Sequence, residues 1–91
     1  KRTKPNLSTA SLETLAIIAY NPQITRAEIE NIRGVSADAC VYKLLEYGLI
    51  QEAGKLDLPG KPMSYKTTDE LWIILYFLYH LNSFQNWNAL Q

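Results

Sequence analysis

The sequence of 91 residues contains one cysteine and one histidine, Cys40 and His80. A single cysteine cannot form an internal disulfide bond, and the two side chains do not match any metal-ligand spacing. Disulfide scaffolds and zinc modules are therefore excluded, and the chain suits a reducing compartment. We expect neither a cofactor nor a metal site, and we predict that Cys40 is a core residue.

Patterns typical of an active site are also missing. The sequence shows no nucleophile with a base, no paired carboxylates and no glycine-rich loop that could hold a phosphate. Nothing near His80 resembles a catalytic partner. The sequence therefore predicts a protein that is not an enzyme and has no catalytic residue and no small-molecule substrate.

Long hydrophobic segments and targeting signals are absent as well. The longest apolar run, residues 71–79, is too short to span a bilayer, and no signal peptide precedes the domain. We therefore expect a soluble, cytoplasmic chain without a membrane partner. Its apolar content of 47% is enough for one small core. We predict a linker over residues 1–7, cut from a longer protein, one domain over residues 8–70, and a helical extension over residues 71–91.

The first predicted helix covers residues 9–20. Ser8 precedes it, and a serine side chain at this position can accept a hydrogen bond from a free backbone amide. Asn21 and Pro22 end the helix. The face predicted to be buried consists of Leu12, Leu15, Ala16 and Ala19.

Residues 24–50 have the pattern of a helix-turn-helix. Thr25 and Glu28 form a T-x-x-E capping box at the start of the first helix, and Gly34 can adopt the left-handed conformation that ends it. The apolar face of this helix is predicted to hold Ile29 and Ile32. Ser36 is predicted to cap the second helix, which Gly48 ends. The apolar stripe of the second helix is Ala37, Cys40, Val41, Leu44 and Leu45.

The outward face of the second helix has few basic residues. It holds Asp38, Ala39, Tyr42, Lys43 and Glu46. A helix that reads DNA relies on Lys and Arg for phosphates and on Arg, Asn and Gln for bases, and only Lys43 fits. The chain has nine basic and nine acidic residues, but three of the basic ones, Lys1, Arg2 and Lys4, precede the domain. The remaining six bases and nine acids argue against DNA as the main partner.

A β-hairpin is predicted after the helix-turn-helix. Residues 49–53 and 63–67 suit strands, and the linking segment GKLDLPGKP, with two glycines and two prolines, cannot be helical. Three helices and a two-stranded wing make a winged helix, mainly α with a small β-hairpin. Thr67 and Glu70 repeat the T-x-x-E pattern and predict an extra C-terminal helix.

The C-terminal helix has more apolar surface than a small core needs, because the run LWIILYFLY has no polar interruption. The set predicted to be core is Leu71, Ile74, Leu75, Leu78 and Leu81. The set predicted to bind a partner is Trp72, Ile73, Tyr76, Tyr79 and His80. Alternatively, the segment SFQNWNALQ folds back and covers Trp72.

Two charged features have more than one interpretation. Arg26, Glu28, Glu30 and Arg33 form either a partner-binding face or a solvated surface. In the wing, residues 59–62 (PGKP) are expected to set the conformation of the loop, and Lys61 is a candidate wing contact.

Several ordered motifs over residues 7–70 resemble one protein family. They are LETLAIIAY at residues 12–20, ITRAEI at 24–29, IRGV at 32–35, PGKP at 59–62, Tyr65, and TTD at 67–69. Together they are similar to the C-terminal winged-helix domain of bacterial segregation and condensation protein B. Lys55 and Lys61 depart from the arginines common in that family, and the apolar helix after Glu70 is longer than is usual there.

This resemblance implies a non-enzymatic subunit of a condensin-like complex, acting in chromosome partition, chromosome condensation and the cell cycle. It implies binding to the kleisin subunit, which bridges the SMC ATPase heads, and a homodimer of the full-length protein. DNA contact would be weak and non-specific, and the location nucleoid-associated. A sequence-specific DNA-binding winged-helix transcription regulator remains the alternative function, because the same architecture serves that role.

Overall fold

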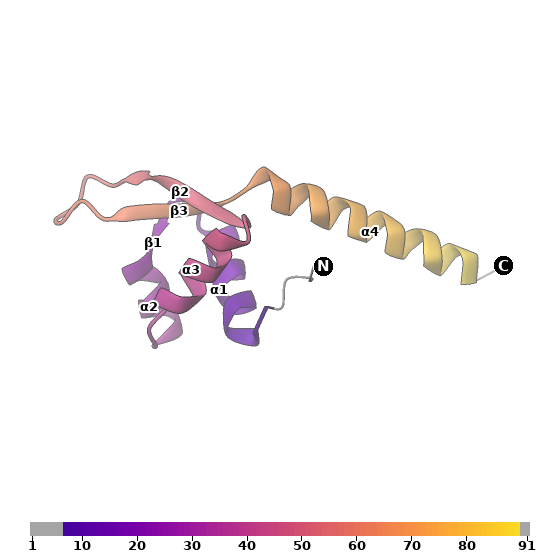
Figure 1. The fold of residues 1–91 in the computed structure, drawn as a ribbon, viewed down its shortest axis with the longest axis horizontal. Coiled ribbons are helices and arrows are strands. Elements are labelled where there is room, and N and C mark those ends of the chain that lie inside the picture. Colours follow the sequence, from indigo (N-terminus) through magenta and orange to yellow (C-terminus); the bar gives the residue numbers. More distant parts are fainter. Residues whose placement is uncertain (1–6, 90–91) are drawn as a thin grey trace.

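A computed structural model describes the backbone of residues 7–89 and the side chains of residues 7–82. In this part the chain forms four helices and a three-stranded antiparallel sheet. The elements in order are α1 (Thr9–Tyr20), β1 (Ile24–Thr25), α2 (Arg26–Arg33), α3 (Asp38–Glu46), β2 (Ile50–Lys55), β3 (Met63–Thr67) and α4 (Asp69–Ala89). Figure 1 shows the sheet on one side of α1, α2 and α3, with α4 projecting away from both layers. The predicted winged helix with an extra C-terminal helix is confirmed.

Helix α1 begins and ends where the sequence predicts, but it buries a different face. The Ser8 side chain accepts a hydrogen bond from the Ser11 amide (3.1 Å) and so caps the helix. The buried residues are Ser11, Thr14 and Ile18, whereas the predicted core residues Leu12 and Ala16 are exposed. Leu15 and Ala19 are half-buried. The small side chains of this face suit a close approach to α3, and the Thr14 hydroxyl is satisfied by the Ala10 carbonyl (2.9 Å).

The capping box of α2 forms as predicted. The Glu28 amide donates to Thr25 Oγ1 (3.2 Å), and the Thr25 amide donates to Glu28 Oε1 (3.0 Å). Gly34 ends the helix in the left-handed conformation with φ 79°. Ile29 is fully buried, but Ile32 remains 58% exposed, so the prediction that both isoleucines face the core was wrong for Ile32.

At the start of α3, a backbone amide is satisfied by a side chain of the neighbouring helix α2 rather than by Ser36. Ala37 occupies the N-cap position, where its amide donates to Glu30 Oε2 of α2 (2.9 Å). Ser36 Oγ lies 3.5 Å from the Asp38 amide, which is a weak contact, so the predicted serine cap was wrong. Of the predicted apolar stripe, Ala37, Val41 and Leu44 are buried, whereas Cys40 and Leu45 are half-buried.

The wing is a hairpin of β2 and β3, to which β1 adds a short third strand in the order β1-β3-β2. The sequence did not indicate β1, and β2 extends two residues beyond its predicted end at Ala53. A bulge between Glu52 and Gly54 interrupts the pairing with β3. Backbone hydrogen bonds from Leu56 to Pro62 and from Lys61 to Leu58 hold the loop at the wing tip.

One core lies between the sheet and the three helices. Its fully buried centre is formed by Ile18, Ile29 and Leu44, one from each helix. The other buried apolar residues are Ile24, Ala37, Val41, Leu49, Ile50 and Leu71.

Helix α4 is tied to the core only at its root. Thr68, not the predicted Thr67, caps it, because Thr68 Oγ1 accepts from the Leu71 amide (3.3 Å) and donates to the Gly48 carbonyl (2.7 Å). The Thr68 amide also donates to the Leu49 carbonyl (3.1 Å). These contacts join the start of α4 to the turn between α3 and β2.

Past Leu71, the side chains of α4 that the structure describes, up to residue 82, are exposed. Leu71 is buried, but the four other residues predicted to be core are exposed: Ile74, Leu75, Leu78 and Leu81. The helix of 21 residues is about 31 Å long in a molecule whose longest dimension is 59 Å. Residues 83–89 continue this helix, so they do not fold back over Trp72, and residues 90–91 lie outside the described part.

The different burial of the two isoleucines of α2 predicts a large difference in stability. Ile29→Ala should lower the free energy of unfolding by about 2–5 kcal/mol, because it opens a cavity at the centre of the core. Ile32→Ala, the same change on the exposed face, should change it by less than about 0.5 kcal/mol. Urea denaturation followed by circular dichroism measures both. Equal losses would show that Ile32 is buried in solution.

Candidate protein-binding surface

The five residues predicted to bind a partner lie along α4 and are all exposed. We call them the aromatic face: Trp72, Ile73, Tyr76, Tyr79 and His80. The rings of Tyr76 and His80 have centroids 4.2 Å apart in an edge-on arrangement, and His80 also lies edge-on to Tyr79 (5.6 Å). The structure therefore groups these side chains on α4, and all five remain exposed.

Trp72 is the most firmly positioned residue of the aromatic face. Its indole Nε1 donates a hydrogen bond to Thr67 Oγ1 at the end of β3 (3.0 Å), while the side chain remains half exposed. Thr67 thus orients the ring instead of capping α4. A fixed, half-exposed tryptophan loses little conformational entropy on binding, which is a property of residues that contribute strongly to interfaces.

A second apolar face of α4 is exposed beside the first. It carries the leucines and isoleucine that were predicted to be core, and it borders an open groove of about 620 Å³. From Leu71 to Ala89 the sequence has no Asp, Glu, Lys or Arg. Contiguous apolar surface of this extent is typical of a contact site. Sequence analysis missed this face because it assigned every leucine of the run to the domain core.

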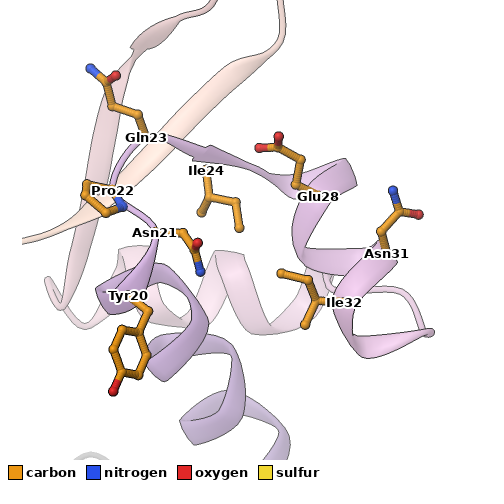
Figure 2. A pocket seen from close by; sticks show the side chains of 8 residues that line it. All are labelled: Tyr20, Asn21, Pro22, Gln23, Ile24, Glu28, Asn31 and Ile32. Atoms are coloured by element: carbon orange, nitrogen blue, oxygen red, sulfur yellow. The ribbon is translucent and has the colours of Figure 1, made fainter.

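Another groove lies where α1, β1 and α2 meet, and sequence analysis did not identify it. It has a volume of about 620 Å³, and Figure 2 shows Ile24 at its centre, with Glu28, Asn31 and Ile32 projecting from α2. At the end of α1, Tyr20 is 87% exposed and points away from Gln23 and Glu28. The complete lining is Tyr20, Asn21, Pro22, Gln23, Ile24, Glu28, Asn31 and Ile32.

The charged residues of α2 mainly hold the helices together. Arg26 pairs with Asp38 at the start of α3 (2.9 Å), and Arg33 lies 3.6 Å from Glu13 of α1. Glu28 and Glu30 accept the backbone hydrogen bonds described above. The two sequence interpretations, partner-binding face or solvated surface, both overlooked these ties between helices.

The outward face of α3 has the composition that the sequence indicates. Asp38, Ala39, Tyr42, Lys43 and Glu46 are all exposed. Lys43 is the only base among them, and the nearby Arg26 is held by Asp38. This helix therefore offers little positive charge to a phosphate backbone. The leader residues Lys1, Arg2 and Lys4, which could touch DNA weakly, lie outside the described residues.

Lys61 lies apart from the aromatic face. It sits at the tip of the wing, which Figure 1 places at the opposite end of the sheet from α4. Its Nζ is 3.5 Å from Asp57 Oδ1, an exposed pair that contributes little to stability. A single partner segment would have to be long to contact both sites.

The described residues provide neither a metal site nor a membrane span. Among residues 7–89, no group of three His, Cys, Asp or Glu side chains could hold a metal ion. Within the same residues, no helix is both long and apolar enough to cross a membrane.

Comparison with known proteins relates the chain to one family. Residues 1–84 match the family described as segregation and condensation complex subunit ScpB. Segregation and condensation protein B of Acetivibrio thermocellus is 61% identical over 71 residues, which cover 78% of this chain and 36% of that protein. The chain therefore spans about a third of the length of that relative.

Solved structures agree with this relationship. ScpB from Mycobacterium tuberculosis is 42% identical, with a TM-score of 0.72 over 81% of this chain and 44% of that one. FabT of Streptococcus pneumoniae, solved in complex with DNA, aligns with a TM-score of 0.62 over 92% of this chain and 62% of its own, but it is only 15% identical and shares the fold alone. The matched sequence profile and the identity to these relatives show that the chain belongs to the family of segregation and condensation complex subunit ScpB.

Proposed function

We propose that this chain is a non-enzymatic protein-binding module of a chromosome segregation and condensation complex, and that α4 binds the kleisin subunit through its aromatic face. The observation that carries the proposal is the exposure of α4 over residues 72–82, a largely apolar segment without Asp, Glu, Lys or Arg. Burial of such a surface against a partner gains about 25 cal/mol for each Å² of apolar area.

The helix itself gives a second reason to expect a partner. Isolated helices of this length are marginally stable in water, because most helical stability in proteins comes from packing of an apolar face. Past Leu71, the described side chains of α4 are exposed. A bound kleisin segment would supply the packing that the domain does not provide.

The remaining parts of the proposal concern the whole protein, of which this chain matches about a third. The full-length protein would form a homodimer and act with the SMC ATPase through the kleisin, close to the nucleoid in the cytoplasm. Lys61 would add a wing contact to an extended partner. Its position far from α4 makes that contact independent of the aromatic face.

DNA binding is the second candidate, favoured only by the likeness in fold to FabT. The charges oppose it, because the outward face of α3 combines Lys43 with Asp38 and Glu46. Residues 5–91 hold six basic and nine acidic residues. A net acidic domain gains little from the release of counterions that drives most DNA association.

Substitution of two rings of the aromatic face should weaken binding without unfolding the domain. For the double variant Trp72→Ala and Tyr76→Ala, we expect a loss of about 2 kcal/mol or more in binding free energy for the kleisin, the size typical of interface hot spots. Isothermal titration calorimetry against the purified kleisin measures it. Tyr42→Ala removes an equally exposed ring on α3 and should leave the affinity unchanged. If both variants bind like the wild-type chain, the aromatic face is not the binding site.

The acidic balance predicts that the chain does not read DNA sequence. Fluorescence anisotropy with labelled duplexes at physiological salt should show no binding tighter than about 1 μM Kd, and any residual binding should fall steeply with salt. A submicromolar complex that discriminates between base sequences would favour the regulator function instead.

A further inference from the structure

A small notch lies between α1 and the root of α4. Its volume is about 250 Å³, and it is lined by Ala16, Ala19, Tyr20 and Trp72. The small side chains of the two alanines form the floor of the notch, and the two larger aromatic side chains form its walls. A concave apolar site bounded by rings is the usual form of a pocket that receives one anchoring side chain.

The notch is formed before any partner binds. The hydrogen bond from Trp72 Nε1 to Thr67 holds the indole at the end of β3. The α1 side belongs to a helix whose opposite face is buried at Ser11, Thr14 and Ile18. The Trp72 wall and the alanine floor are therefore fixed by the domain itself, whereas Tyr20 is 87% exposed. Because Trp72 is also the first residue of the aromatic face, the notch and that face form one continuous surface.

The charged side chains of the two helices that form the notch are acidic over their described residues. Glu13 lies three residues before Ala16, and Asp69 lies three residues before Trp72, so each shares a helix face with a residue of the notch. Glu70 is on the other side of α4, where its carboxylate lies beside Gly48. Neither α1 nor α4 contains Lys or Arg over its described residues. Arg33 offsets part of the charge of Glu13 from a distance of 3.6 Å, and Asp69 is the carboxylate on the α4 side of the notch.

We propose that the notch receives one large apolar side chain from a kleisin segment that carries Lys or Arg on both sides of it. This inference rests on the proposed function and specifies the chemistry of the segment. The apolar side chain matches the alanine floor and aromatic walls, and the flanking bases match Glu13 on the α1 side and Asp69 on the α4 side. An acidic segment is rejected, because its charges would meet like charges beside a partly desolvated surface.

Filling the notch tests the proposal. Ala16→Phe places a ring in the site without altering Trp72, and because Ala16 is exposed the domain should keep its fold. Ala27→Phe makes the same change at an exposed position of α2 outside the notch and is the matched control. Calorimetric titration of each 91-residue variant with the purified kleisin should show about a tenfold or greater loss of affinity for Ala16→Phe and little change for the control. Thermal unfolding followed by circular dichroism verifies that both variants are folded.

Overlapping synthetic peptides of 20 residues that cover the kleisin sequence identify the segment. The peptides that bind the wild-type chain should contain a large apolar residue between basic residues, and they should lose binding to the Ala16→Phe variant. Peptides that bind through acidic sequences, or that bind both forms equally, would overturn the proposal.

The two proposals fail in different ways. If the kleisin binds Ala16→Phe as tightly as the wild-type chain, the notch is not its anchor site, while the proposed function stands. If the kleisin does not bind the wild-type chain, the proposed function is wrong and the notch loses its occupant. If Ala16→Phe and Ala27→Phe weaken binding equally, the effect is not specific to the notch and the inference is again wrong.

Discussion

The limited volume of the core governs the arrangement of the whole chain. Three helices and the sheet meet around Ile18, Ile29 and Leu44, and nine buried apolar side chains fill the space between them. Among the described side chains of α4, Leu71 alone reaches this space. Because protein interiors are packed as tightly as organic crystals, a core of this size holds few side chains. The described side chains that follow, up to residue 82, lie at the surface.

The number of basic side chains available for binding is also limited. Residues that form charged pairs between helices cannot also provide a basic surface for phosphates. Arg26 pairs with Asp38 within the helix-turn-helix, and Arg33 approaches Glu13 of α1. A fold shared with DNA-binding proteins is thereby left with a weakly charged outward face. The surface that we propose for partner binding lies instead on α1 and α4.

Much of the fold could be predicted because its signals are local. Ser8, the Thr25 and Glu28 box, and Gly34 each act through hydrogen bonds or backbone conformations within a few residues, so the sequence reveals them directly. The winged-helix arrangement followed from the order of these elements.

The errors concern contacts between distant segments. The cap of α3 comes from Glu30 of another helix, and β1 exists because its two residues pair with β3. The prediction of the buried face of α1 was wrong. Hydrophobicity favours Leu12, whereas close packing against α3 favours the smaller Ser11 and Thr14. For the candidate site, the aromatic residues were identified from composition. The notch was not, because its alanines matter only through their position opposite Trp72.

The attachment of α4 has a mechanical consequence. Two hydrogen bonds of Thr68 join the start of the helix to the turn at Gly48 and Leu49, and past Leu71 no described side chain is buried. The helix is therefore a lever with its fulcrum at the turn between α3 and β2. Over about 31 Å, each degree of rotation at the fulcrum moves the far end by about 0.5 Å. A force on the far end of α4 would act as torque on the junction of the helix-turn-helix and the wing.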